Sequence, residues 1–217
     1  FNETISRKIN NFKNNNLIIF DIGCYQGNFS RSLRKLLDKT AKFYLFDPNP
    51  SLKVRDFNII QLAFSNKIKM QNYYVNLSFP AAGSSINNTM KDDKSWNFTR
   101  KLITGNLKKD YSKLNIKTNT VDNFCNKEQI KHITVLKIDA EGHDAEILEG
   151  AKIMLINTQF VQVEVLDAQK YYNKKFTKIK KILEKHNFRI IEKKNIWSVG
   201  LFSNLKACDL LFYKDSL

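Results

Sequence analysis

The stretch LIIFDIGCYQGNFSRSLRKLLDK, residues 17–39, decides the fold class. It opens with an apolar, β-branched run, which predicts a buried strand over 17–23. Residues 27–39 then carry apolar side chains at helical spacing, which predicts a helix. Its apolar face is formed by Phe29, Leu33, Leu36 and Leu37. A strand that passes through a glycine turn into a helix is the repeating unit of a parallel α/β sheet.

The same alternation continues along the chain. Further strands are expected over 42–47, 57–64, 133–139, 159–165, 189–195 and 207–214, with helices over 143–157 and 172–188. This order predicts an α/β fold with helices on both faces of a mostly parallel sheet. No linker interrupts the chain, so residues 1–217 are expected to form a single domain.

Residues 66–120 break this rhythm. Two alternating segments, 71–77 and 114–121, read as strands, and a long connection separates them. Connections of that length are uncommon inside a compact domain and are often functional. We therefore expect a substrate-recognition insertion here.

The chain is strongly basic, with a formal net charge of +15 over 217 residues. Such an excess suits an anionic partner, for example nucleic acid, an acidic glycan or a membrane surface. Lysine outnumbers arginine about fivefold, however. Nucleic-acid-binding surfaces favour arginine, because its planar guanidinium grips phosphate with two hydrogen bonds. The charge is therefore attributed first to biased composition, and nucleic acid stays the second choice of partner.

Targeting signals and metal-ligand spacings are missing from the sequence. No apolar run reaches about 18 residues, so no membrane-spanning helix is expected. The N-terminal segment 1–16 lacks the apolar core of a signal peptide. The cysteines at 24, 125 and 208 are odd in number and far apart, as are the three histidines, so neither disulfides nor a metal site are expected. These features together predict a cytoplasmic protein.

Acidic and glycine residues follow the first two predicted strands, at the edge where open α/β sheets bind ligands. Gly23 and Gly27 allow a tight turn and close approach of a ligand. Asp21 can hold this loop or accept hydrogen bonds from a cationic amine. Asp47 ends the second strand, where doubly wound folds hold the two hydroxyls of a ribose.

The turn is poorly suited to a dinucleotide. Tyr25 occupies the place of the second glycine in G-x-G-x-x-G, and a pyrophosphate needs bare backbone N–H groups there. S-adenosylmethionine has an adenosine for Asp47 to hold, no phosphate, and a cationic amino group that suits an acidic loop. A methyltransferase therefore fits better than a dehydrogenase.

Four segments resemble, in order and spacing, the motifs of FkbM-type S-adenosylmethionine-dependent methyltransferases. They are IFDIGCYQGNFS, YLFDPNP, TNTVDNF and VLKIDAEGHDAEILEGA, within residues 17–165. The resemblance implies a Rossmann-like class I methyltransferase, with a seven-stranded sheet whose final strand is antiparallel. It also implies O-methylation of a hydroxyl on a sugar, glycan precursor or other small molecule, with S-adenosylhomocysteine as product.

The resemblance carries site residues over to this chain. The implied cofactor contacts are Asp21, Gly23, Cys24, Tyr25, Gly27, Asp47, Pro48, Ala63, Phe64 and Asp139. Substrate contacts are implied at Ser84 and Ser85. The family usually has Asn at the place of Tyr25 and Glu at the place of Asp47.

Catalytic candidates cluster in KIDAEGHDAEILEG, residues 137–150. Asp139 and Glu141 follow the fourth strand and lie at the ligand-binding edge. The other three acids are expected to shape and solvate the next helix, with Asp144 and Glu146 in its first turn and Glu149 in a pair with Lys152.

His143 is the preferred general base. It begins this helix, where the positive end of the dipole keeps an imidazole neutral. A general base contributes about 10²–10⁴-fold to rate, so His143→Ala is expected to lower kcat by that order.

Two alternatives stay open. One is an RNA methyltransferase that uses the basic surface, and the other is a non-catalytic module that binds the cofactor. No pattern in the sequence names the methyl acceptor or the oligomeric state.

Overall fold

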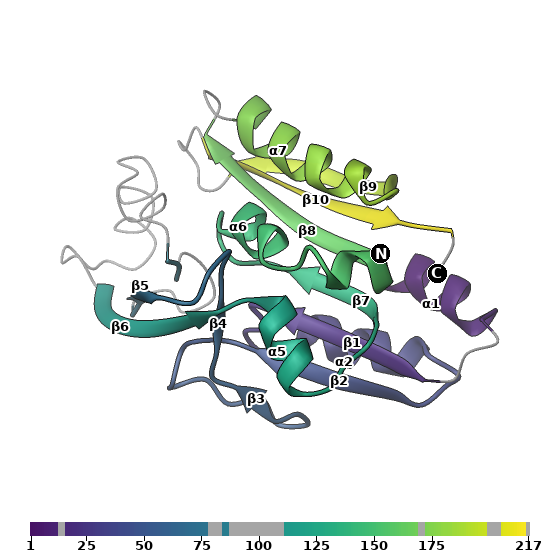
Figure 1. Cartoon of the computed structure of the whole chain (residues 1–217), viewed down its shortest axis with the longest axis horizontal. Helices are drawn as coiled ribbons and strands as arrows, with labels where there is room; N and C mark the ends of the chain where they lie inside the picture. The colour runs from purple at the N-terminus through teal and green to yellow at the C-terminus, as the bar shows by residue number, and fades with distance from the viewer. Residues whose placement is uncertain (13–15, 78–83, 87–110, 169–171, 199–204, 216–217) are drawn as a thin grey trace.

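A computed structural model of the chain describes residues 1–12, 16–77, 84–86, 111–168, 172–198 and 205–215 (Figure 1). A seven-stranded sheet with the order β3-β2-β1-β7-β8-β10-β9 forms its centre. The strands of this sheet are β1 (Leu17–Ile22), β2 (Ala41–Phe46), β3 (Ile59–Ile60), β7 (Ile133–Ile138), β8 (Thr158–Ala168), β9 (Arg189–Ser198) and β10 (Leu205–Tyr213). β10 pairs antiparallel with both β8 and β9, whereas the other pairings are parallel. This confirms the predicted sheet and its final antiparallel strand.

Helices cover both faces of the sheet, as predicted. One face packs against α5 (Val121–Lys127), α6 (Asp144–Glu149) and α7 (Tyr172–Lys185). The other packs against α1 (Asn2–Asn10) and α2 (Asn28–Leu36). All residues of β1 and β7 are buried, because a central parallel strand contacts helices on both sides.

A second, three-stranded sheet has the order β4-β6-β5 and projects from one end of the main sheet (Figure 1). It consists of β4 (Ala63–Phe64), β5 (Met70–Asn76) and β6 (Tyr111–Asn119). β5 and β6 confirm the two strands predicted in the insertion. The connection between them, residues 78–83 and 87–110, lies outside the described part of the chain.

Three details of the sequence-based prediction are wrong. The strand predicted over 57–64 splits into β3 and β4, because β3 pairs with β2 while β4 pairs with β6 in the other sheet. The helix predicted over 143–157 ends at Glu149 and is followed by a short 3₁₀ helix, η1 (Met154–Asn157). The side chain of Asp122 accepts hydrogen bonds from the backbone N–H groups of residues 153 and 154, which holds this break. Leu36 is exposed rather than part of the buried face of α2.

Two helices, α1 and α5, were not predicted. Thr120 caps α5, since its hydroxyl oxygen accepts a hydrogen bond from the Asn123 N–H at 3.0 Å. α5 places Phe124 in a cluster of aromatic rings that also contains Phe20, Phe46 and Phe64. The cluster joins β1, β2 and β4 below the pocket described in the next subsection.

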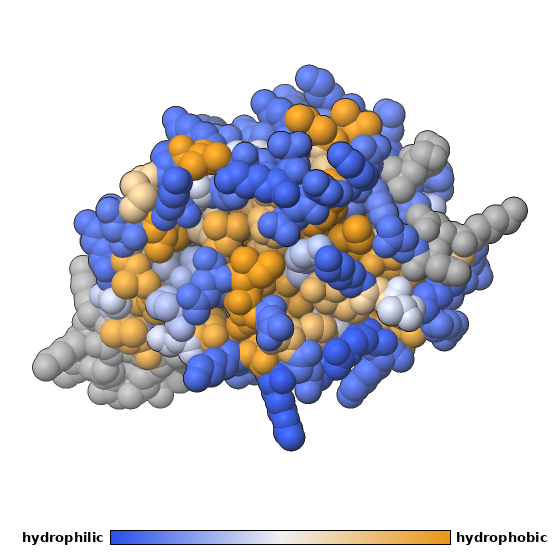
Figure 2. All heavy atoms as spheres, turned by 60° about the horizontal axis from the view of Figure 1, so that its bottom comes forward, coloured by the Kyte–Doolittle hydropathy of each residue, from blue (hydrophilic) through white to orange (hydrophobic). Residues whose placement is uncertain are grey.

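Apolar side chains gather on the face of the molecule shown in Figure 2, with polar side chains around them. A groove between the β3–β4 segment and β6 is lined in part by the apolar residues Leu62, Ile68, Leu114 and Ile116. Within the described ranges, no helix is long and apolar enough to span a bilayer.

Candidate active site

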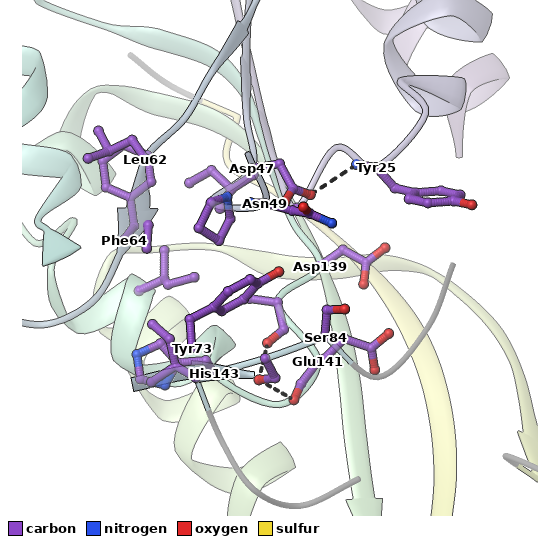
Figure 3. A pocket seen from close by; sticks show the side chains of 18 of the residues that line it. Tyr25, Asp47, Asn49, Leu62, Phe64, Tyr73, Ser84, Asp139, Glu141 and His143 are labelled. Atoms are coloured by element: carbon purple, nitrogen blue, oxygen red, sulfur yellow. Dashed lines mark hydrogen bonds between the residues drawn. The ribbon is translucent and has the colours of Figure 1, made fainter. Parts of the chain in front are cut away.

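A pocket lies at the carboxyl ends of β1, β2 and β7, the edge where open α/β sheets bind ligands (Figure 3). The empty space between these strand ends measures about 740 Å³, including the part that is open to solvent. Each of these three strands supplies one predicted site residue at its end: Gly23, Asp47 and Asp139. The predicted residues that line the pocket are Gly23, Tyr25, Asp47, Pro48, Ala63, Phe64, Ser84, Ser85, Asp139, Glu141 and His143.

The turn after β1 approaches the end of β7 so closely that only glycine fits. Gly23 has φ +70°, and a Cβ placed there would lie 1.8 Å from the Asp139 carbonyl oxygen. Gly27 also has φ +70°, but its Cβ would meet side chains, with Val54 Cγ1 at 2.9 Å. Tyr25, between them, adopts φ +44° without being a glycine. A left-handed tyrosine is unfavourable, and such strain concentrates at functional sites.

Asp47 is buried beneath this turn. Its Oδ2 accepts a hydrogen bond from the Tyr25 N–H at 3.4 Å, and its Oδ1 accepts one from the Asn49 N–H at 2.9 Å. Burial raises the pKa of Asp47, while these two backbone hydrogen bonds oppose the rise. An ionised carboxylate has about four lone-pair sites, so two remain for ligand hydroxyls.

The two sides of the pocket differ in chemistry. Leu62 and Phe64 form an apolar wall on one side (Figure 3). On the other side lie the carboxylates of Asp139 and Glu141, with Asp47 between the two groups. Glu141 has φ +51°, a second strained non-glycine residue at the rim. The arrangement can hold a molecule with a flat apolar end, a diol and a cationic or hydroxylated end.

Asp21, Cys24 and Gly27 are not among the lining residues. Asp21 is fully buried and accepts a hydrogen bond from the Ser30 hydroxyl at 2.8 Å. Burial raises the pKa of the Cys24 thiol, so it stays protonated. Asp21 belongs to β1, whereas Cys24 and Gly27 belong to the turn itself and are joined by a hydrogen bond from the Gly27 N–H to the Cys24 carbonyl oxygen at 2.7 Å.

His143 immediately precedes α6, as predicted, and is buried. Its Nε2 lies 3.0 Å from the Ser65 hydroxyl, and its Nδ1 lies 3.8 Å from Glu146 Oε2. Burial lowers the pKa of His143 and keeps the ring neutral, although Glu146 acts in the opposite direction. Only Nε2 is within hydrogen-bond distance of a protein group, whereas Nδ1 is buried without a hydrogen-bond partner among the described residues, and Figure 3 shows the ring apart from the Asp139 and Glu141 carboxylates.

Ser85 ties the insertion to the loop after β7. Its backbone pairs with that of Tyr74, with N···O distances of 2.9 and 3.0 Å. Its hydroxyl lies 3.2 Å from the carbonyl oxygens of both Ala140 and Glu141. Ser84 instead accepts a hydrogen bond from the Asn76 N–H and lies at the pocket wall.

Two assignments of the acids after β7 need correction. Glu149 pairs with Lys178 at 3.0 Å rather than with Lys152, because α7 packs against α6. Asp144 is not solvated: it is 2% exposed and accepts hydrogen bonds from the N–H groups of Ala140 and Gly142. Burial, with a further contribution from Asp139, raises the pKa of Asp144 to about 8.

Sequence reasoning assigned no role to several residues of the site. Tyr73, on β5, lines the pocket from the insertion, and nothing local in the sequence marks it. Asn49 lies within the YLFDPNP motif, and Leu62 directly precedes the predicted site residues Ala63 and Phe64. Their position in the sequence could therefore have indicated that they line the pocket. Lys137 lies inside a recognised motif, but its contacts cross from β7 to β1.

The strand order, the glycine turn and the acid at the end of β2 define a Rossmann-like methyltransferase fold. The model of the methyltransferase FkbM domain matches residues 21–190. The chain belongs to the FkbM methyltransferase family.

Individual relatives are distant. The 2-O-methyltransferase NoeI of Sinorhizobium fredii (strain NBRC 101917 / NGR234) is 21% identical over 175 residues, covering 71% of this chain and 65% of the relative. The chain thus spans about two thirds of the length of this curated relative.

Two solved structures are similar to the chain. A precorrin-6y C5,15-methyltransferase from Geobacter metallireducens GS-15 is 11% identical, with a TM-score of 0.44, and the match covers 99% of this chain and 86% of that one. A SAM-dependent methyltransferase from Aquifex aeolicus is 14% identical, with a TM-score of 0.38 and coverages of 98% and 89%. Both TM-scores are below 0.5, so the fold class rests on the strand order of the chain itself.

Proposed function

We propose that this chain transfers a methyl group from S-adenosylmethionine to a hydroxyl oxygen of a sugar, glycan precursor or other small molecule. One observation carries the proposal: the Asp47 carboxylate stands between an apolar wall and a pair of carboxylates, at the ligand-binding edge of the sheet. The FkbM family match supports methyl transfer. The relative named as a 2-O-methyltransferase supports oxygen as the acceptor atom.

The pocket fits S-adenosylmethionine part by part. Leu62, Ala63 and Phe64 offer apolar surface for an adenine. The free lone pairs of Asp47 suit the two ribose hydroxyls. The turn at Gly23 leaves backbone close to the pocket, where any side chain would collide with Asp139. Asp139 supplies a carboxylate for the cationic amino group of the methionine part.

When bound, the cofactor supplies an electrophilic methyl group on a sulfonium. The chain then has to align the acceptor hydroxyl and take its proton. Alignment of two reactants can contribute about 7–11 kcal/mol, more than a general base provides. The strained rim at Tyr25 and Glu141, together with Ser85, fixes the walls that would perform this alignment.

The proton acceptor is proposed among His143, Asp139 and Glu141, and the geometry favours the two carboxylates. His143 is buried and its Nε2 already contacts the Ser65 hydroxyl, whereas the Asp139 side chain is 40% exposed and Glu141 lines the pocket. Three variants separate the candidates: His143→Gln, Asp139→Asn and Glu141→Gln. A 10²–10⁴-fold loss of kcat at saturating S-adenosylmethionine in one of them identifies the base, and the His143 and Glu141 variants should retain their affinity for S-adenosylhomocysteine. If only the histidine variant loses activity, the original sequence-based choice is right.

The experiment that tests the function is methyl transfer from radiolabelled S-adenosylmethionine into a cell extract separated into RNA, protein, polysaccharide and small molecules. Label in polysaccharide or small molecules is expected. Label that disappears on ribonuclease treatment would assign the acceptor to RNA instead. Asp47→Ala serves as the control that should lose labelling. Binding of S-adenosylhomocysteine without labelling in any fraction would favour a non-catalytic cofactor-binding module.

A further inference from the structure

The ammonium group of Lys137 joins the turn after β1 to the end of β7. Lys137 is 7% exposed, and its Nζ donates a hydrogen bond to the Gly23 carbonyl oxygen at 2.9 Å. The same Nζ lies 3.1 Å from Asp21 Oδ1 and 3.3 Å from Asp139 Oδ2. Its three neighbours come from two strand ends that are more than 100 residues apart in the sequence.

Lys137 is not placed to contact a ligand directly. An ammonium has three N–H groups and no acceptor, and three oxygens already surround this one. Lys137 and Asp21 do not line the pocket, whereas Gly23 and Asp139 do. Any effect of Lys137 on a bound molecule must therefore pass through those two residues.

The charge of Lys137 is maintained by its neighbours. Burial alone would lower the pKa of the ammonium, but Asp21 and Asp139 outweigh burial and hold its pKa above the ordinary value. Without this cation, the fully buried Asp21 would lose its counter-ion, and Asp139 could turn away toward solvent. A buried ion pair that loses one partner is strongly destabilised, whereas replacing both partners by neutral groups is often neutral.

We propose that Lys137 is a positioning residue of the cofactor site, which fixes the Gly23 carbonyl and the Asp139 carboxylate where the methionine part of S-adenosylmethionine contacts them. This inference rests on the proposed function. It assigns to Lys137 a role in affinity that is separable from its role in stability. The distinction follows from the contacts. The ion pair with Asp21 stabilises the buried core, whereas the contacts with Gly23 and Asp139 hold two residues that line the pocket.

The test compares three variants with the wild type, using S-adenosylhomocysteine as the probe. Lys137→Met removes the charge and keeps the side-chain length. Asp21→Asn/Lys137→Met also removes the buried carboxylate charge, so it is the variant expected to fold normally. Lys181→Met, at an exposed position on α7, is the matched control. Thermal unfolding reports stability, and calorimetric titration well below the unfolding temperature reports affinity.

We expect Lys181→Met to bind within twofold of the wild type. The double variant should recover most of the thermal stability lost in Lys137→Met, yet bind at least tenfold more weakly than the wild type. A purely structural role would not separate the two readouts. If the folded double variant binds within threefold of the wild type, the inference is overturned. If the wild type itself does not bind the probe, the proposed function fails first, which is a distinguishable result.

Discussion

Replacing Gly23 or Gly27 by alanine probes how the pocket is built, because the two glycines share one backbone conformation and differ in their surroundings. Both have φ +70°, which costs a non-glycine residue roughly 1–2 kcal/mol. At Gly27 the new methyl group would meet Val54 Cγ1 at 2.9 Å and Leu45 Cδ2 at 3.2 Å. Side chains can move, and overpacking of this kind costs about 1–3 kcal/mol. Gly27→Ala should therefore lower the free energy of unfolding by about 2–5 kcal/mol.

The methyl group of Gly23→Ala would lie 1.8 Å from the Asp139 carbonyl oxygen. This oxygen belongs to backbone at the end of β7, which cannot rotate away as a side chain can. The turn and the strand end must then separate, and that displaces Asp139 and opens the pocket floor. We expect Gly23→Ala to lower the free energy of unfolding by at least about 2 kcal/mol more than Gly27→Ala does. A loss of that size is typical of severe disruption of a protein core.

Urea unfolding of both variants measures the difference between their free energies of unfolding. Titration of the folded fraction with S-adenosylhomocysteine measures the affinity of the pocket. Binding should be lost in Gly23→Ala and weakened less in Gly27→Ala. Equal free energies of unfolding, or the reverse order, would refute the close approach of the turn to β7.

Three further predictions concern single carboxylates and the strained turn. Asp47→Asn should weaken S-adenosylhomocysteine binding at least tenfold, because hydrogen bonds to a charged acceptor are worth about 1.5–3 kcal/mol each. Asp38→Asn, which changes an exposed acid, is the control. Unchanged affinity in Asp47→Asn would remove Asp47 from the site. Tyr25→Asn should raise the free energy of unfolding by about 1 kcal/mol, because asparagine tolerates φ +44° better than tyrosine. The expected rise in Tm is about 2–4 °C. A lower Tm would show that the tyrosine ring stabilises the fold by more than its backbone strain costs. Asp144 has a folded-state pKa of about 8, above its unfolded value, so its contribution to stability is complete at low pH and is lost as pH rises toward 8. Asp144→Asn should therefore gain stability relative to the wild type between pH 5 and 8, by at most about 1.4 kcal/mol per pH unit, and parallel stability curves would contradict this.

The seven-stranded sheet was predictable because most of its strands, and the helices between them, have a recognisable local pattern of apolar residues. The strand over residues 17–22 is buried throughout and is apolar except for Asp21, as expected of a strand covered on both faces. Gly23 and Asp47 were predictable for the same reason: they end strands, and the carboxyl ends of parallel strands share one edge. β3 and β4 follow each other closely in the sequence but belong to different sheets. Their apolar pattern is continuous, so the sequence does not show where one strand ends and the next begins.

The environment of each side chain was decided by contacts across the fold. His143 has a helix-start position that was predicted, yet its partner Ser65 lies 78 residues away and turns its Nε2 toward protein. Asp144 reads as a solvated first-turn acid, but the loop after β7 folds over it and burial changes its charge state. Tyr73 reaches the pocket from the insertion without any local mark.

The sequence by itself determined the order of elements, the sheet edge that binds ligands and the acids that end its strands, since these depend on periodicity and on residues adjacent in the chain. Only the tertiary structure decided which of those acids face the pocket and which serve the core. Lys137 shows why: its contacts with Gly23, Asp21 and Asp139 join separate strand ends, and the two carboxylates keep it charged although it is buried. Hydrogen bonding and desolvation depend on distance in space, which no local pattern encodes.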